Sequence, residues 1–277
     1  MRIYSEESQK SKTVINCLKS YKLRNLSKKI LKLSGKVAIV TGGSRGIGFA
    51  TAKIFAENGA NVVITAKDSK RLENAVNEIP NSVGITADIR NENDVKKVVE
   101  QTIKKFGKLD ILINNAGIFP KIKQLHEIEE FEWNEVLDVN LTGQFRFTKV
   151  AIPYLKKTSG SIVNISSDAG LKAYQGFNAD AYSASKAGMI ILTKCWALEY
   201  AKDKIRVNCI CPGVVDTDMT KPFLKTEKDR DFMNNEHPLG RIGQPDEVAK
   251  AILYFVSDDA AWTTGAILTV DGGESIK

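Results

Sequence analysis

Short apolar runs alternate with longer amphipathic stretches from residue 36 to the end of this 277-residue chain. The apolar runs predict seven strands, at 37–40, 61–65, 83–87, 109–113, 161–165, 205–210 and 266–270. The stretches between them predict helices at about 46–58, 69–79, 91–106, 128–155, 180–202 and 246–257, with a break near Pro153. Apolar strands separated by long helices are typical of parallel sheets that are covered on both faces. We therefore predict a single α/β domain, a doubly wound seven-stranded parallel sheet with helices on both faces.

The positive charge of the chain is concentrated at its N-terminus. Residues 1–34 hold nine of the 40 Lys and Arg residues and two of the 33 Asp and Glu residues, which leaves 31 of each sign in residues 35–277. A neutral body argues against a nucleic-acid-binding face on the folded domain. We therefore predict a basic extension, 1–34, and a folded domain, 35–277. Apolar residues recur at near-helical spacing in the extension, which fits binding to an anionic membrane surface, organelle targeting or a passive segment.

Composition excludes several classes of protein. No apolar run approaches the ~18 residues of a membrane span. With only His126 and His237, a His-rich metal site is excluded, and we predict no metal. The four cysteines lack metal-like or disulfide-like spacing, which favours a reducing, cytoplasmic compartment. They are Cys17, Cys195, Cys209 and Cys211.

The predicted helix 180–202 contains two residues whose side chains are suited to proton transfer. Tyr182 and Lys186 are four residues apart, so a helix places them on one face, about one turn from each other. A lysine beside a tyrosine favours the phenolate and lowers a pKa that starts near ~10. Such a tyrosine can exchange a proton with an alcohol or carbonyl oxygen at neutral pH. The spacing alone is common on exposed helices and does not establish catalysis.

A glycine-rich turn follows the first predicted strand. Its glycines at 42, 46 and 48 allow a tight turn and a close approach of backbone N–H groups to a pyrophosphate. The spacing differs from both the G-x-G-x-x-G fingerprint and the Walker A loop. Its position at the first βα crossing of a doubly wound sheet favours dinucleotide binding, and hence a Rossmann-type domain, over a simple tight connection.

Six short motifs share the order and spacing found in one protein family. They are Thr41-Gly42-x-x-x-Gly46-x-Gly48, Asn114-Asn115-Ala116-Gly117, Asn140, Ser167, Tyr182-x-x-x-Lys186 and Pro212-Gly213. On these residues the chain resembles the short-chain dehydrogenase/reductases over roughly 35–273. The resemblance implies a catalytic set made of Asn140, Ser167, Tyr182 and Lys186. Ser166 competes for the role of the serine, but Gly170 fits the family's S-x-x-G pattern and favours Ser167.

The resemblance also implies a mechanism, in which a hydride moves between a nicotinamide and a carbonyl or alcohol carbon. Tyr182 exchanges the proton on oxygen, Lys186 lowers the pKa of Tyr182 and binds the nicotinamide ribose, and Ser167 orients the substrate oxygen. Asn140 holds a water that links Lys186 to solvent. The implied cofactor-binding residues are Gly42, Ser44, Arg45, Gly46, Ile47, Gly48, Lys67, Asp88, Ile89, Asn115, Ala116, Gly117, Tyr182, Lys186, Pro212, Gly213, Val215 and Thr217.

The end of the second predicted strand bears on the choice of cofactor. An acid there binds the ribose 2′-OH of NAD, whereas a cation accommodates the 2′-phosphate of NADP. Here the strand ends in Ala66 and Lys67, with no acid before Asp68, and Arg45 adds a cation from the glycine turn. We therefore expect a preference for NADP(H), with NAD(H) as the alternative.

The chain is similar to the 3-oxoacyl-thioester reductase branch and to the sugar or polyol dehydrogenase branch of this family. We expect an NADP(H)-dependent 3-oxoacyl-thioester reductase, with a sugar or polyol dehydrogenase or a nucleotide-sensing scaffold without turnover as alternatives. Three segments are expected to line the substrate end, at 118–125, 170–180 and 216–243, and the last is expected to act as a mobile lid. The resemblance further implies a homotetramer, with a small carbonyl or alcohol compound as the substrate.

Overall fold

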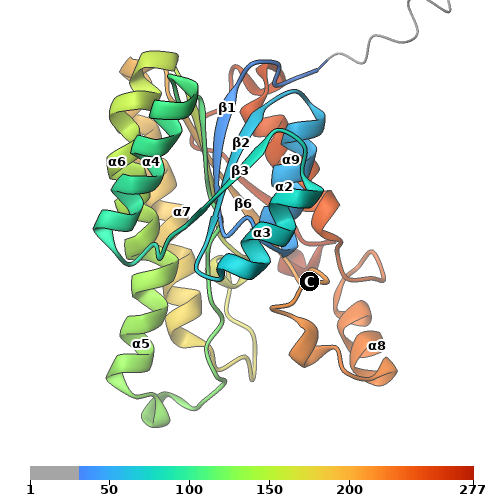
Figure 1. The fold of residues 1–277 in the computed structure, drawn as a ribbon. Helices are drawn as coiled ribbons and strands as arrows, with labels where there is room; N and C mark the ends of the chain where they lie inside the picture. The colour runs from blue at the N-terminus through green and yellow to red at the C-terminus, as the bar shows by residue number, and fades with distance from the viewer. Residues whose placement is uncertain (1–30) are drawn as a thin grey trace, which may run out of the picture. The chain divides into compact units, whose positions relative to one another are not determined.

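The computed structural model describes residues 31–277, which fold into a parallel sheet with a layer of helices on each face (Figure 1). The strands are β1 (Val37–Thr41), β2 (Asn61–Ala66), β3 (Ser82–Thr86), β4 (Ile111–Asn114), β5 (Ser161–Ile165), β6 (Arg206–Pro212) and β7 (Ile267–Val270). The helices are α2 (Gly46–Glu57), α3 (Ser69–Glu78), α4 (Glu92–Phe106), α5 (Glu130–Leu137), α6 (Gly143–Thr158), α7 (Asp180–Tyr200), α8 (Glu227–Glu236) and α9 (Pro245–Val256). The predicted fold class is confirmed: all seven strands are parallel.

The order of the strands creates a crevice at the centre of the sheet. The order is β3-β2-β1-β4-β5-β6-β7, so the chain builds outward from β1 in one direction and then reverses. β1 pairs with both β2 and β4. In open α/β sheets, ligands bind beyond the carboxyl ends of the strands at such a reversal. The loops that follow β1 and β4 are therefore the first place to look for a site.

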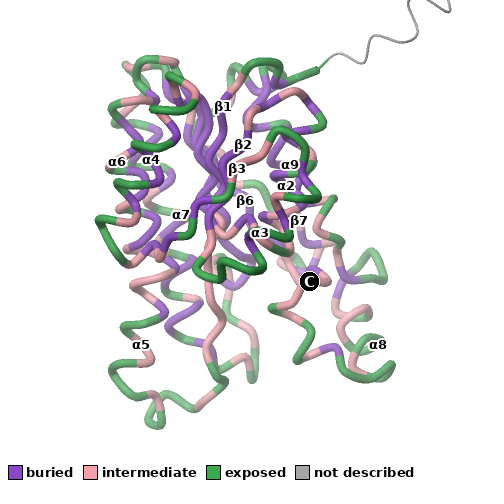
Figure 2. Tube along the Cα trace, viewed as in Figure 1, coloured by how far each residue is buried: buried purple, intermediate pink, exposed green. Residues whose placement is uncertain are grey.

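Two apolar cores lie on the two faces of the sheet, and the strands are the most buried part of the domain (Figure 2). Along β1, Ala38 and Val40 belong to the core under α2, α3 and α9, whereas Ile39 belongs to the core under α4, α6 and α7. Side chains of a strand alternate between faces, so a strand that is covered on both sides is apolar throughout. This is why the apolar runs of the sequence located the strands.

The break predicted near Pro153 is wrong. α6 continues through Pro153 to Thr158, and the irregular part of the helical region is a π-helical turn, Asp138–Thr142, between α5 and α6. A proline removes one backbone hydrogen bond from a helix. Here Phe147, Ala151 and Leu155 are buried against the sheet and hold α6 in place across that missing bond.

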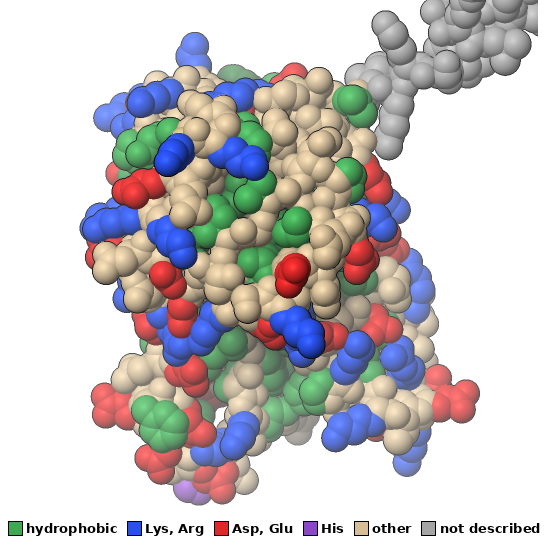
Figure 3. All heavy atoms as spheres, viewed as in Figure 1, with side chains coloured by type: hydrophobic (Ala, Val, Ile, Leu, Met, Phe, Trp, Pro, Cys, Tyr) green, Lys and Arg blue, Asp and Glu red, His purple; other side chains and the backbone are tan. Residues whose placement is uncertain are grey.

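The segment after β6 holds the helix α8, which has no buried residue and is capped by Thr226. Lys, Arg, Asp and Glu side chains are interspersed on the face of the domain shown in Figure 3. Cys209 and Cys211 are buried core residues with free thiols. Within the described residues, no helix is long and apolar enough to cross a membrane. The predictions of membrane binding or organelle targeting for the N-terminal extension concern residues 1–30, which lie outside the part of the chain that the structure describes.

Candidate active site

A cavity of about 420 Å³ lies beyond the carboxyl ends of the central strands. Its wall is formed by the loops after β1, β2, β4, β5 and β6 together with the start of α7. All the residues that we predicted to bind the cofactor lie on this wall, and so do Ser167, Tyr182 and Lys186. Asn140 is buried behind the wall. Residues that are spread over the sequence from Gly42 to Thr217 thus meet in one place.

The conformation of the glycine turn allows a phosphate group to come close to its backbone. Gly42 has a φ of +65°, and a Cβ on Gly48 would lie 2.4 Å from the Gly42 carbonyl oxygen. α2 begins directly after this turn, and Arg45 at its N-cap makes no side-chain hydrogen bond to the helix. The first N–H groups of α2 are therefore not capped by that side chain, and they carry the positive end of the helix dipole. A pyrophosphate group suits this position.

Hydrogen bonds join the glycine turn to the loop after β4. The Thr41 hydroxyl accepts hydrogen bonds from the backbone N–H groups of Asn115 and Ala116, at 2.9 and 3.0 Å. The Asn115 side chain donates to the carbonyl oxygens of Thr41 and Gly42. These contacts hold the two loops on either side of the crevice at a fixed separation.

Three cations surround the end of the cavity beside β2. Arg45 and Lys67 were predicted here, and Arg71 of α3 was missed although it lies one helical turn beyond Asp68. Asp218, from the loop after β6, lies 3.2 Å from Arg45 and 3.5 Å from Arg71. Arg71 and Asp218 lie on different elements that are far apart in the sequence, so no local spacing pattern predicts their contact.

Asp88 lies on the cavity wall and forms ion pairs with two cations. Its carboxylate lies 2.8 Å from Arg90 and 3.2 Å from Lys67. The Arg90 guanidinium, and to a lesser extent Lys67, hold the pKa of Asp88 well below its usual range. Asp88 is therefore ionised at neutral pH and partly neutralises the positive charge of Lys67.

Tyr182 and Lys186 lie one turn apart on α7, as their spacing predicted. The Lys186 Nζ lies 5.5 Å from the centre of the Tyr182 ring and donates a hydrogen bond of 2.9 Å to the carbonyl oxygen of Ile165. Both side chains are buried.

The expected lowering of the Tyr182 pKa is not found in this structure. Burial raises the pKa of Tyr182 to about 12, and a hydrogen bond with Ser167 offsets part of that rise. Burial also lowers the pKa of Lys186 to about 8. The loss of solvent disfavours the charged form of each group, the phenolate of Tyr182 and the ammonium of Lys186.

The two candidate serines have different partners. Ser166 donates its hydroxyl proton to the Lys186 carbonyl oxygen at 2.8 Å, so it fastens β5 to α7. Ser167 is the serine that interacts with Tyr182. A Cβ on Gly170 would lie 2.7 Å from the carbonyl carbon of Lys186, so a glycine lets the turn after Ser167 pack on α7. This geometry favours Ser167 over Ser166.

Asn140 lies in the π-helical turn between α5 and α6. Its side chain accepts a hydrogen bond from the Ile118 N–H at 2.8 Å and donates one to the Ile118 carbonyl oxygen at 2.9 Å. A further bond of 3.3 Å joins it to the Ser185 hydroxyl on α7. Asn140 therefore fastens the loop after β4 to α7. π-helical turns often occur at functional sites, but no sequence period marks them.

An aromatic cluster beside Tyr182 was missed, although its members lie in segments predicted to line the substrate end. The Phe119 ring lies 5.0 Å from the Tyr182 ring, 5.6 Å from Phe177 and 5.4 Å from Phe223, between ring centres. Tyr174 lies 6.0 Å from Phe177. We call Phe119, Tyr174, Phe177 and Phe223 the aromatic cluster. The aromatic residues of segments 118–125, 170–180 and 216–243 are the signal that could have identified it.

Comparisons with known proteins identify relatives that match most of this chain. Residues 42–275 match a family model described as enoyl-(acyl carrier protein) reductase. The chain is 40% identical over 248 residues to the 3-oxoacyl-[acyl-carrier-protein] reductase FabG of Thermotoga maritima, covering 88% of this chain and 99% of that protein. It is 39% identical over 249 residues to the L-fucose dehydrogenase of Bos taurus, covering 88% and 91%.

A solved structure shows the same fold. The crystal structure of gox2181 matches with a TM-score of 0.86 and 33% sequence identity, over 89% of this chain and 98% of that one. The chain therefore belongs to the short-chain dehydrogenase/reductase family, the oxidoreductases that act on CH–OH and C=O groups.

Proposed function

We propose that this protein is an NADP(H)-dependent reductase of 3-oxoacyl thioesters. The aromatic cluster is the observation that carries the choice of substrate class. Phe119 and Phe177 are half-buried beside Tyr182, and half-buried Phe223 packs on Phe119, so the three rings offer apolar surface to whatever binds there. An acyl chain gains free energy by covering such surface, whereas the hydroxyl groups of a sugar lose their water without gaining hydrogen bonds.

The proposed mechanism assigns one task to each of four residues. Tyr182 donates its proton to the carbonyl oxygen, and a phenol with a pKa of about 12 holds that proton at neutral pH. Ser167 binds the same oxygen, and the Lys186 ammonium stabilises the phenolate that forms. Asn140 fixes the loop after β4 against α7. NADP(H), when bound, supplies the hydride or accepts it.

The residues around the cavity fit the cofactor. We propose that the backbone of Gly42, Gly46 and Gly48 and the start of α2 bind the pyrophosphate. A Cβ on Gly46 would lie 3.3 Å from the Thr217 side chain, so the glycine keeps this approach open. The remaining contacts are proposed as follows: Ser44 and Ile47 with the glycine turn; Asp88 and Ile89 at the adenine; Asn115, Ala116 and Gly117 along the cofactor; Lys186 on the ribose; and Pro212, Gly213, Val215 and Thr217 at the nicotinamide.

The preference for NADP(H) is supported by the cations beside β2. We propose that Arg45, Lys67 and Arg71 bind the 2′-phosphate. Measurement of kcat/KM with NADPH and NADH tests this assignment. The Arg45→Ala and Lys67→Ala variants are each expected to lose about tenfold with NADPH, the effect of one charge-assisted contact, and little with NADH. Lys70→Ala, an exposed neighbour outside the cavity, is the matched control. A wild-type preference for NADH would refute the assignment.

A substrate panel tests the reaction. NADPH oxidation is followed with acetoacetyl and longer 3-oxoacyl thioesters and with 2-enoyl thioesters, and NADP reduction is followed with sugars and polyols. We expect kcat/KM to be highest for the 3-oxoacyl thioesters and to rise with chain length. L-Fucose oxidation is the second candidate, because a relative named L-fucose dehydrogenase is 39% identical. Higher kcat/KM on sugars would favour it, and tight NADPH binding without turnover would favour the scaffold.

We further propose a cytoplasmic homotetramer. Phe145 on α6 and Ile191 and Leu198 on α7 are exposed apolar side chains, which a symmetric partner would cover. Phe147 on α6 and Trp196 on α7 are buried core residues and do not contribute to this surface. Light scattering of the purified protein measures the oligomeric state, and a monomer at micromolar concentration would contradict this proposal.

A further inference from the structure

Asp168, which follows Ser167 in the chain, is a buried carboxyl group in contact with the candidate catalytic serine. Its Oδ1 accepts the Ser167 hydroxyl proton at 2.8 Å and the Ala169 N–H at 2.7 Å. Its Oδ2 accepts the Tyr174 hydroxyl proton at 2.7 Å. The family resemblance assigns no role to this position, and nothing in the mechanism above uses it.

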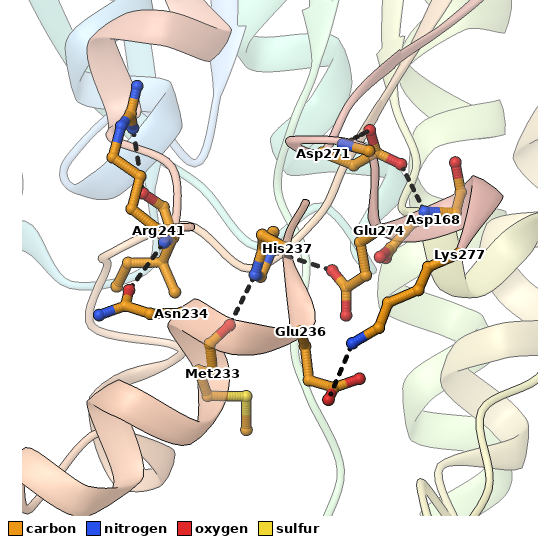
Figure 4. Close-up of polar contacts among 12 residues, drawn as sticks. Asp168, Met233, Asn234, Glu236, His237, Arg241, Asp271, Glu274 and Lys277 are labelled. Atoms are coloured by element: carbon orange, nitrogen blue, oxygen red, sulfur yellow. Dashed lines mark hydrogen bonds and ion pairs between the residues drawn. The ribbon is translucent and has the colours of Figure 1, made fainter. Parts of the chain in front are cut away.

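A second buried carboxyl group, Glu274, lies against Asp168 from the C-terminal end of the chain (Figure 4). Burial is the main cause that raises the pKa of Asp168, and the charge of Glu274 and a hydrogen bond with it raise that pKa further. The pKa of Glu274 is lowered, chiefly by its hydrogen bond with His237, so Asp168 is the first of the two carboxyl groups to take up a proton as the pH falls. Glu274 also accepts a hydrogen bond from the Val214 backbone. A Cβ on Gly213 would lie 2.9 Å from the Glu274 Oε2, so this carboxylate packs directly on the segment proposed to bind the nicotinamide.

His237, at the end of α8, fixes the charge of Glu274 from the other side. The His237 Nδ1 lies 2.7 Å from the Met233 carbonyl oxygen, and its Nε2 lies 3.0 Å from the Glu274 Oε2 (Figure 4). Each ring nitrogen thus faces an oxygen that accepts a proton. A neutral imidazole has one N–H and satisfies only one of them. The imidazolium satisfies both, and the pKa of His237 is accordingly raised, chiefly by its hydrogen bond to Glu274.

We propose that Asp168 is a positioning residue for the reaction, which controls whether the Ser167 hydroxyl proton is available to the substrate oxygen. Glu274, held by His237, favours the protonated form of Asp168, and in that form the Ser167 proton is easier to release. This inference rests on the proposed role of Ser167.

The hydrogen bond between Ser167 and Asp168 links the charge of Asp168 to the reaction. During carbonyl reduction, negative charge develops on the substrate oxygen, and a Ser167 hydroxyl that turns toward it stabilises that charge. Turning away takes one donor from Asp168. An ionised, buried carboxylate loses more by this than a neutral carboxyl group, because unsatisfied buried charges are the more costly. The protonated form of Asp168 therefore favours reduction.

Other titratable and charged groups lie around Asp168 and Glu274 and can also affect the pH dependence of kcat. Tyr174 and Ser167 contact Asp168 directly. The charge of Asp168 acts on Tyr182 from α7 and on Cys211 from β6. Asp271 acts on Tyr174, and the Lys172 Nζ donates a hydrogen bond to the Glu274 backbone carbonyl.

The test is the pH dependence of kcat for reduction of whichever carbonyl compound the protein turns over. In the wild type, kcat falls as the pH rises through about 6, the pKa to which Asp168 is raised. Asp168→Asn, which mimics the neutral carboxyl group, removes this fall and keeps kcat at or above the wild-type value at pH 7. Asp168→Ala, which removes the acceptor that orients Ser167, lowers kcat about tenfold, the effect of one hydrogen bond to a charged group.

Two further variants separate positioning from a merely structural role. Glu274→Gln removes the negative charge that raises the pKa of Asp168, so the fall in kcat moves to lower pH. Glu100→Gln, which replaces an exposed acid on α4 away from the cavity, leaves the profile unchanged. If Asp168→Asn and Glu274→Gln change thermal stability but keep the wild-type profile, Asp168 is only structural and the proposal is wrong.

An infrared titration detects the proton on the Asp168 carboxyl group without any substrate. The carbonyl band of a buried, protonated carboxyl group is expected to grow in the wild type as the pH falls through about 6 and to be absent in Asp168→Asn. If this band behaves as expected while the 3-oxoacyl thioesters are inert, the proposed substrate is wrong and the carboxyl pair stands. If the band is the same in both proteins, Asp168 does not take up the proton and the proposal is wrong.

Discussion

Replacing Lys186 by methionine is expected to make the cofactor-free protein more stable at pH 7 while abolishing turnover. Burial lowers the pKa of Lys186 from 10.5 to about 8, which corresponds to a destabilisation of about 3 kcal/mol at neutral pH. Methionine removes that cost but leaves the Ile165 carbonyl oxygen without its hydrogen bond from Lys186, which costs about 1–2 kcal/mol. The expected net gain in the free energy of unfolding is therefore about 1–2 kcal/mol.

The stability advantage of Lys186→Met over the wild type decreases as the pH rises. Below pH 8, Lys186 is charged in both the folded and the unfolded chain, and the full cost is present. Between about pH 8 and 10.5 the folded protein has lost the proton and the unfolded chain has kept it, so wild-type stability rises with pH relative to the variant.

Urea denaturation at pH 7 and at pH 9.5 measures both effects. The advantage of Lys186→Met should shrink by about 2 kcal/mol between these two pH values. Lys194→Met, on the exposed side of α7, is the control and should not change this dependence. Equal pH dependence in Lys186→Met and the wild type would refute the idea that burial depresses the Lys186 pKa.

Two further substitutions test the geometry behind the site. Asn140→Ala is expected to lower the free energy of unfolding by about 2–3 kcal/mol in urea denaturation, because it removes two hydrogen bonds to the Ile118 backbone. Asn134→Ala, at an exposed position of α5, is the control. A loss below about 0.5 kcal/mol for Asn140→Ala would contradict the reasoning. Gly143→Ala places a Cβ 2.2 Å from the Ile89 side chain, and overpacking of this kind costs about 1–3 kcal/mol. It should also raise the NADPH dissociation constant by pushing Ile89 into the cavity, and unchanged stability with unchanged affinity would show that the contact is easily relieved.

The fold could be predicted because its signals are local. A strand covered on both faces is apolar throughout, so each run of the sequence located one strand of the sheet. The glycine turn and the Tyr182–Lys186 spacing are equally local, since each depends on residues within one turn or one loop. Hence the cavity wall contains every residue that was predicted for the cofactor.

The parts that were missed depend on contacts between distant segments or on solvent exclusion. The π-helical turn that holds Asn140 is set by the Ile118 backbone, which no spacing within the helix reveals. Asp168 and Glu274 meet only once β5 and β7 lie in one sheet. The spacing of Tyr182 and Lys186 gave their separation but not their burial, and burial reversed the predicted direction of the Tyr182 pKa.

The central claim is that Tyr182 transfers the proton in an NADP(H)-dependent carbonyl reduction, and Tyr182→Phe tests it most directly. NADPH binding is measured by fluorescence titration and turnover by NADPH oxidation, on the same preparation of variant and wild type. We predict a dissociation constant within about twofold of the wild type and a loss of kcat of about 10²–10⁴-fold, the usual contribution of a positioned general acid. A variant that binds NADPH normally and retains near-normal kcat would contradict the account.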